Sequence, residues 1–457
     1  PAARAPPAAV PCQFTAFPKV FNHANVCANG CPHCDRARAG FDPICYCDDA
    51  CESAGVCCCP ECAGSDTSEV AYFCSSGAPG APTLAPTAAP VTAAPTAAPA
   101  KPVAIMTTHY VTDGADGVDR ADSVEAVLDG ALRLPESPKG SADDFPAVRV
   151  YVVSSGIDCQ HAEFDAKGVK GSRCVPAYDA LTGTACAADS AAGCADDDIG
   201  TGTHIAGTIA GKQVGMSPDA TVYAVKLYAN GEKGDVVDAL DFVASQREQL
   251  GEDELILVAL DLANAGDADA TTAAVARLVD LGVPVVAPAG DSFGSGGGGD
   301  ACALTPASME NVVAVGSLTL TTNVTGGLID TTSDFSNSGK CVDLFAVGSD
   351  ILSAWPGLGA QSNVFKTLSS TSSSMAAVAG AMANLMSLFA AAGEPAPLPA
   401  TLADLLIQGA NAGPPDKLLN TTATNRVLYV GFDDADRYPT LAQYFNALLG
   451  DIDGGEP

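Results

Sequence analysis

Four short apolar runs, each ending at small or polar residues, constrain the fold of this chain more than any other feature. They read VRVYVVSS at 148–155, TVYAVKLY at 221–228, ELILVALDL at 254–262 and GVPVVAPAG at 282–290. Amphipathic helix patterns at 236–250 and 271–281 separate the later runs, and the first of them places Val237, Leu240 and Val243 on one face. Strands that alternate with helices predict an α/β fold: a mainly parallel sheet covered on both faces, with ligands at the carboxyl ends of the strands.

The longest apolar run, residues 375–393, is long enough to be compared with a membrane span. Asn384 and Ser387 interrupt it, and small residues crowd its start. Because 47% of the 457 residues are hydrophobic and only 17% are charged, the chain can build a sizeable core in more than one domain. We therefore predict a buried core helix here and no membrane span.

The net charge excludes one large class of partner. Asp and Glu number 54 against 22 Lys and Arg, which gives a formal charge of −32. A surface of this sign repels polyphosphates and anionic lipid headgroups. We expect an extracellular protein or peptide as partner, and no nucleic acid.

Cysteines are concentrated near the N-terminus, with 12 of the 18 lying between Cys12 and Cys74. Such density predicts a disulfide framework formed in an oxidising compartment, so we expect a small disulfide-rich module at 1–74 and a secreted, extracellular protein. The Cys-x-Cys-Asp sequence at 45–48 and the adjacent pair at 57–58 resemble the somatomedin-B module, a small disulfide knot that binds extracellular proteins.

A second interpretation of the same cysteines stays open. Cys31-x2-Cys34 and Cys59-x2-Cys62 have the spacing of a four-thiolate zinc site. The other cysteines of the segment would then remain as free thiols, so the disulfide framework is the preferred interpretation.

Composition divides the rest of the chain. Residues 75–102 repeat Pro, Thr and Ala with almost no charge, which predicts an extended linker between two modules. We expect a folded domain at 103–431 and an acidic C-terminal tail at 432–457.

Several motifs follow one another in a recognisable order in the second module. They are GVDR at 117–120, TPAS at 305–308, FSNSGKCVDLFAVGSDILSAW at 335–355 and TNRVLY at 424–429. Together they resemble the subtilisin-like serine peptidases, and most closely their proteinase K-like branch. The resemblance implies a three-layer subtilisin-like fold, proteolysis of polypeptide substrates and no required cofactor.

The residues that would perform this chemistry depart from the family pattern. The family's first strand ends in Val-Ile-Asp-Thr-Gly, and Ser154 replaces the aspartate that orients the catalytic histidine. The family's Gly-His-Gly-Thr-His aligns with residues 200–204, which puts Thr201 at the catalytic histidine and His204 at a structural one. The base and its orienting carboxylate are therefore both replaced.

A serine remains at the nucleophile position. SSTSSSMAAVAG at 369–380 aligns without gaps with the family's nucleophile segment and places Ser372 at the start of a helix, whose positive end favours an alkoxide. A gapped alignment selects Ser374 instead. Serine at a helix start is also a common structural cap.

Two further functional positions are altered. Asp291 replaces the asparagine whose amide stabilises the oxyanion in the family, so a charged acceptor stands where a donor is needed. The family's substrate-binding Ser-Leu-Gly strand here reads Asp261, Leu262 and Ala263.

We therefore predict a catalytically inactive homologue that binds proteins or peptides. Loss of the base alone costs about 10⁶ in turnover in subtilisin, itself a member of the resembled family. Two alternatives stay open. One is an active endopeptidase that uses Ser372 with a non-standard base, such as Asp198 or a histidine of a neighbouring molecule. The other is a surface or matrix protein in which the acidic fold is only a spacer.

The resemblance also implies features of the scaffold. It pairs Cys302 with Cys341 in a disulfide, and it assigns Asp343, with the backbone carbonyls of Glu310 and Val312, to a structural calcium site. Four other cysteines are expected to pair with their neighbours in sequence: Cys159, Cys174, Cys186 and Cys194. N-glycan acceptor sequons begin at Asn323 and Asn420.

Overall fold

The computed structural model of the chain describes residues 147–432 with short gaps at 167–168, 170, 188–192, 252–253, 264–267, 293–298, 324–325, 358–362, 392–393 and 414–425. It also describes short segments on either side, at 21–22, 44–45, 106–110, 119–122, 128, 131–135, 434, 437–438 and 441. The chain divides into two compact units, Pro1–Thr96 and Ala97–Pro457.

In the first unit, β1 (Phe21–Asn22) pairs antiparallel with β2 (Ile44–Cys45). The rest of the predicted cysteine-rich module, its zinc alternative, the linker at 75–102 and most of the tail at 432–457 lie outside the described residues. Their boundaries and chemistry therefore stay predictions.

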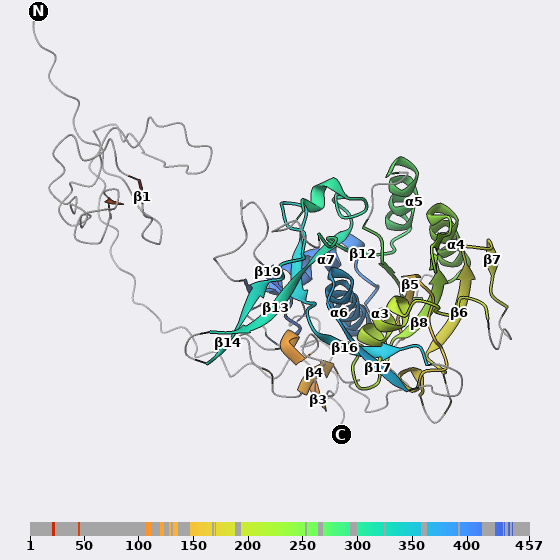
Figure 1. Cartoon of the computed structure of the whole chain (residues 1–457), viewed down its shortest axis with the longest axis horizontal. Coiled ribbons are helices and arrows are strands. Elements are labelled where there is room, and N and C mark those ends of the chain that lie inside the picture. Colours follow the sequence, from red (N-terminus) through yellow and green to blue (C-terminus); the bar gives the residue numbers. More distant parts are fainter. Residues whose placement is uncertain are drawn as a thin grey trace, which may run out of the picture. The chain divides into compact units, whose positions relative to one another are not determined.

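Within the described residues, eleven strands of the second unit form one sheet (Figure 1). Their order is β18-β19-β15-β13-β12-β11-β5-β8-β6-β7, with β14 paired to β13. All neighbours from β19 to β6 run parallel, whereas β18, β14 and β7 are antiparallel additions. The strands are β5 (Arg149–Ser154), β6 (Cys174–Asp179), β7 (Thr184–Ala185), β8 (Thr221–Lys226), β11 (Ile256–Leu260), β12 (Val285–Pro288), β13 (Val313–Thr322), β14 (Leu328–Thr332), β15 (Leu344–Val347), β18 (Asn411–Ala412) and β19 (Arg426–Val427). This sheet confirms the predicted α/β fold.

Helices cover both faces of the sheet because alternate residues of each strand point in opposite directions. On β5, Val150 and Val152 share a buried cluster with residues of α3 (Thr201–Ala210) and α6 (Thr371–Ala391). Tyr151 and Val153 of the same strand instead join the cluster that includes α4 (Val236–Gln249) and α5 (Ala268–Asp280). Helix α7 (Pro399–Gly409) contacts α6.

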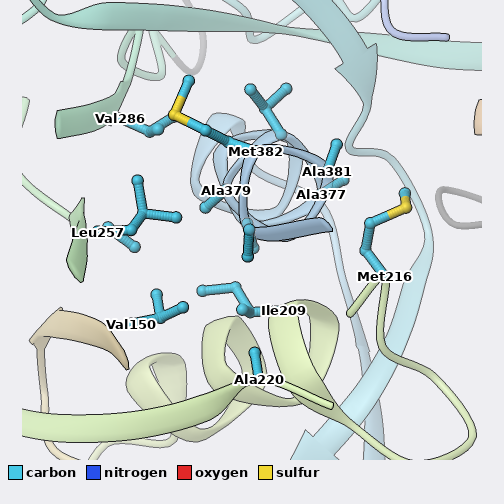
Figure 2. Packing of buried hydrophobic residues seen from close by; sticks show 14 of the residues in the cluster. Val150, Ile209, Met216, Ala220, Leu257, Val286, Ala377, Ala379, Ala381 and Met382 are labelled. Carbon is cyan, nitrogen blue, oxygen red and sulfur yellow. The ribbon is translucent and has the colours of Figure 1, made fainter. Parts of the chain in front are cut away.

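Helix α6 forms the centre of the larger cluster. In Figure 2, its residues Ala377, Ala379 and Met382 lie among Val286 of β12 and Ile209 of α3. Among the described helices, α6 is long and apolar enough to cross a membrane, but 89% of its most apolar window is buried inside the domain. The apolar run is therefore a core helix over its described part, residues 375–391, as predicted.

Smaller elements surround the sheet. The antiparallel hairpin of β16 (Ile351–Trp355) and β17 (Val364–Leu368) contacts α3. Before the sheet, β3 (Met106–Tyr110) pairs with β4 (Ala131–Pro135). A buried ion pair of 2.6 Å joins Arg120, in η3 (Arg120–Asp122), to Asp330 of β14. The remaining short elements are η5 (Ala162–Phe164), β9 (Tyr228–Ala229), β10 (Glu232–Lys233) and η6 (Ala301–Ala303).

Three disulfides lie within the described residues, and each joins cysteines adjacent among those of the domain: Cys159–Cys174, Cys186–Cys194 and Cys302–Cys341. The last closes the longest loop, with a sequence separation of 39. On a chain-entropy estimate, a loop of that size stabilises the fold by about 4 kcal/mol.

Candidate active site

Four side chains from distant parts of the sequence meet at the carboxyl end of the sheet. Ser154 is the last residue of β5, and Asp261 follows the neighbouring parallel strand β11. The backbone N–H of Asp261 donates to the carbonyl of Val153, at 3.0 Å, which fixes the two strand ends side by side. Thr201 begins α3 and Ser372 lies in the first turn of α6.

A single carboxylate connects two of these groups. The Ser154 hydroxyl donates to Oδ2 of Asp261, and the Ser372 hydroxyl donates to Oδ1, each at 2.7 Å. Asp261 is partly exposed, but its carboxyl is surrounded by protein, so desolvation raises its pKa. The hydrogen bonds from Ser372 and Ser154 act in the opposite direction.

A pocket of about 400 Å³ opens beside this carboxylate. Ser154, Thr201 and Asp261 line it together with residues of β9 and β10. The residue predicted from the resemblance to bind substrate therefore faces the same space as Ser154 and Thr201, the two residues predicted to stand at triad positions. The next two residues of the predicted substrate-binding segment are not among the pocket's lining residues: Leu262 is buried and Ala263 is partly buried.

A buried acid holds the start of α3 in place. Asp197 accepts hydrogen bonds from the backbone N–H groups of Gly200 and Thr203, at 2.7 and 2.8 Å, and from the Ser155 hydroxyl. The Ser155 hydroxyl in turn accepts from the N–H of Gly202. A carboxylate at a helix N-terminus satisfies N–H groups that have no partner within the helix.

Two histidines of the domain are buried and bonded to backbone carbonyls. His204 is 1% exposed, and its Nε2 donates to the carbonyl of Ile351 at 2.9 Å. His161 is also buried, and its Nε2 donates to the carbonyl of Val364 at 2.8 Å. His109 lies on β3, and His23 and His33 fall outside the described residues.

The environment of His204 makes folding depend on pH. Burial lowers its pKa from 6.5 to about 4, so only the unfolded chain takes up this proton between those values. Its contribution to stability is therefore complete above pH 6.5 and is lost as the pH falls toward 4, by about 3 kcal/mol. We expect His204→Gln to flatten the slope of unfolding free energy against pH in this range, measured by urea titration. Equal slopes in both proteins would contradict the assignment.

Neither the serines next to Ser372 nor Asp198 bond to Asp261. Ser373 is buried and its hydroxyl bonds to that of Ser370, at 3.2 Å. Ser374 is fully buried, and its hydroxyl has no partner among the described residues. Asp198 pairs with Lys226 at 2.6 Å. Of the three consecutive serines, Ser372 is the one whose hydroxyl bonds to Asp261.

Asp291 acts here as an acceptor toward α6. Its Oδ1 accepts the backbone N–H of Thr371, the first residue of that helix, at 2.9 Å. The hydroxyl of Thr371 accepts from the N–H of Gly290. Asp291 is exposed as a residue, but partial desolvation of its carboxyl raises its pKa, and the hydrogen bonds from Thr371 act in the opposite direction.

Asp343 carries the chemistry expected of a cation ligand. Its Oδ2 accepts the N–H of Ala314 at 2.9 Å, which places it beside the strand that follows Val312. Burial raises the pKa of Asp343 to about 6, and a bound cation would favour the ionised form. Carboxylate and carbonyl oxygens suit Ca²⁺. In the described part of the chain, the surroundings of Asp343 included, no three His, Cys, Asp or Glu side chains converge as a metal site.

The pattern that describes the subtilase family matches residues 146–428, which is more than half of the chain. The chain belongs to the subtilase family. Subtilisin-like protease 2 of Pseudogymnoascus destructans is 34% identical over 269 residues, which cover 58% of each protein. The extracellular serine proteinase of a Thermus species is 32% identical over 270 residues, 58% of this chain and 55% of that protein. The family acts on proteins and peptides, and this chain is a homologue of its serine proteases.

A solved structure supports the same assignment. The crystal structure of a cold adapted subtilisin-like serine proteinase superposes with a TM-score of 0.53 at 30% identity, over 69% of this chain and 97% of that one. The chain matches 58% and 55% of the length of the two curated relatives above. Their activities are therefore not transferred with the fold.

Proposed function

We propose that this chain is a secreted subtilase homologue that binds polypeptides and no longer hydrolyses peptide bonds through a histidine base. One observation carries the proposal: the hydroxyl of Ser372 donates a hydrogen bond to the carboxylate of Asp261 and not to a histidine. The family pattern, aligned with residues 200–204, supports it by putting Thr201 at the histidine position. The three disulfides and the cysteine-rich N-terminal segment support an extracellular location.

Peptide hydrolysis needs more than a nucleophile. The amine leaving group must receive a proton, and histidine supplies it near neutral pH. In subtilisin, which belongs to this family, removal of the base costs about 10⁶ in turnover and removal of the oxyanion amide costs about 10²–10³. With Thr201 and Asp291 at these positions, we expect no peptide turnover at neutral pH.

The remaining cleft suits an extended ligand. It lies at the carboxyl ends of parallel strands, where α/β proteins bind ligands, and the pocket beside Thr201 is open to solvent. Backbone groups of an edge segment pair with an extended peptide without any proton transfer. Recognition therefore does not require the residues that were replaced.

A library of random octapeptides tests this proposal on the full chain. We expect capture by the wild-type protein, and an affinity at least tenfold lower for Thr201→Trp, which fills the 400 Å³ pocket. The matched control is Thr401→Trp, because Thr401 lines a second pocket of about 470 Å³ beside α7. Equal losses in both variants, or a loss only in Thr401→Trp, would contradict the assignment of the cleft.

We also propose that Asp343, with the carbonyls of Glu310 and Val312, holds a structural calcium ion. Calcium at 100 times its Kd is expected to stabilise the wild-type chain by about 2.7 kcal/mol and to leave Asp343→Asn unchanged, measured by thermal unfolding with and without a chelator. Asp404→Asn, a change on the exposed face of α7, serves as the control. An equal response of all three proteins would contradict the site.

A further inference from the structure

We propose that Asp261 is a general base for Ser372, so that this cleft reacts with activated acyl donors although it lacks a histidine. The inference goes beyond polypeptide binding, because it gives the same cleft a covalent chemistry limited to good leaving groups. It also assigns the non-standard base that the sequence left open.

The geometry is that of a nucleophile and its base. The Ser372 hydroxyl points its proton at Oδ1 of Asp261 across 2.7 Å, within the range required for general base catalysis. Ser372 is partly exposed, so an acyl carbon can approach its oxygen. The acceptor is a carboxylate in a desolvated position, where its basicity is greater than in water.

Ser154 is a positioning residue in this arrangement. It is fully buried, and its hydroxyl holds Oδ2 of Asp261 at 2.7 Å, which turns the other oxygen toward Ser372. Its own backbone is fixed, since its carbonyl accepts the N–H of Leu227 at 2.6 Å. Ser154 therefore orients Asp261, Asp261 acts as the base, and Ser372 is the nucleophile.

The reaction balances with these groups alone. Oγ of Ser372 forms a bond to the acyl carbon while its proton moves to Oδ1 of Asp261. The bond from the acyl carbon to the leaving oxygen then breaks, the electron pair departs on that oxygen, and the proton passes from Asp261 to it or to solvent. Water attacks the acyl-serine ester in the second half, again giving its proton to Asp261, and Ser372 regains a proton as the acid leaves.

The same groups explain why the chemistry stops at activated donors. A phenolate leaves without a proton, whereas an amine must be protonated before it leaves. A carboxylate is also a weaker base than imidazole, so it activates Ser372 only for attack on carbonyl carbons that carry a good leaving group. The first-turn N–H groups of α6 favour an oxyanion, but the exposed carboxylate of Asp291 opposes it. Nitrophenyl esters and fluorophosphonates therefore fit the site, and unactivated amides do not.

The reaction should depend on the ionisation of Asp261. The groups that face it are Ser154 from β5, Ser372 from α6 and Tyr228 from β9. The charges of Asp197 and Asp291 also lie close enough to oppose its ionisation. Glu232 and Lys233 of β10 line the same pocket with opposite charges. We expect the acylation rate to rise with pH through one ionisation, and burial places the pKa of that ionisation above the usual range of an aspartate.

The test uses the full chain with p-nitrophenyl acetate and a fluorophosphonate probe. Wild type should be acylated at Ser372, Ser372→Ala should not be labelled, and Asp261→Asn should lose about 10²–10³ in rate at pH 7. Ser154→Ala should shift the midpoint of the pH profile, a change that a merely structural role would not produce. Ser374→Ala and Asp404→Asn are matched controls that should keep the wild-type rate.

Circular dichroism and thermal unfolding identify a variant that has not folded, and the wild-type pH profile then decides the question alone. Equal labelling of wild type and folded Asp261→Asn, or a wild-type rate independent of pH, would overturn the inference. Absent labelling would do so as well and would leave octapeptide binding, and hence the proposed function, intact. Cleavage of unactivated peptides by the wild type would instead refute the proposed function.

Discussion

Thr201→His restores peptide hydrolysis only when Asp261 is removed at the same time. The simplest restoration, Thr201→His with Ser154→Asp, would place a second carboxylate where the Ser154 hydroxyl now lies 2.7 Å from Asp261. Two carboxylates at this separation do not both ionise, so one stays protonated and the histidine lacks its orienting charge. The triple variant also carries Asp261→Ser. It has one carboxylate in place of two, and the pocket beside position 201 can then hold the imidazole.

We expect the triple variant to cleave a peptide anilide about 10²–10⁴ times faster than the wild type at pH 7, and the double variant less than tenfold faster. Addition of Asp291→Asn should contribute a further factor of about 10². The control is the triple variant with Ser372→Ala, which should return to background. A double variant as active as the triple would show that Asp261 does not obstruct the site.

Gly202→Ala is expected to destabilise the domain by about 3 kcal/mol or more. A Cβ at this position would lie 2.0 Å from the carbonyl oxygen of Gly156, a backbone atom that cannot rotate away. Gly156 is itself held at φ +97°, so neither side of the contact has room to adjust. The contact sets the distance between the start of α3 and the end of β5, and hence between Thr201 and Ser154.

Gly251→Ala is the matched control, because no atom lies within 4 Å of its Cβ position and its φ is not positive. Urea unfolding should show a much lower midpoint for Gly202→Ala, whereas the free energy of unfolding of Gly251→Ala should lie within about 0.5 kcal/mol of wild type. Octapeptide binding should weaken only in the first. Similar midpoints for the two variants would contradict the proposed packing of α3.

The sheet and its helices were predictable because their sequence signal is local. Runs such as 148–155 and 254–262 carry apolar side chains on both faces, which is typical of parallel strands buried on both sides. The core position of α6 was also predictable, since Asn384 and Ser387 break its apolar surface. The cysteine-rich segment has a clear composition, but apart from residues 21–22 and 44–45 it lies outside the described residues, so its module assignment stays a prediction.

The role of Asp261 was not predictable from the sequence. The resemblance assigns that position to substrate binding, and neither spacing nor periodicity shows which way a side chain turns after a strand. Its contacts depend on the space beside Thr201 and on hydroxyls 107 and 111 positions away. One signal was available: Asp261 and Ser154 end two apolar runs, and neighbouring parallel strands place such residues together. The buried position of Ser374 likewise depends on tertiary packing, because all three serines begin the same helix.

Binding of peptides without their hydrolysis is tested by measuring turnover and binding in one sample. Wild-type protein and Ser372→Ala are incubated at pH 7 with the octapeptide library, and both the bound and the free peptides are analysed by mass spectrometry. We expect the two proteins to retain the same peptides, all intact. Products that form with the wild type and not with Ser372→Ala would show that the site is a working peptidase and would contradict it.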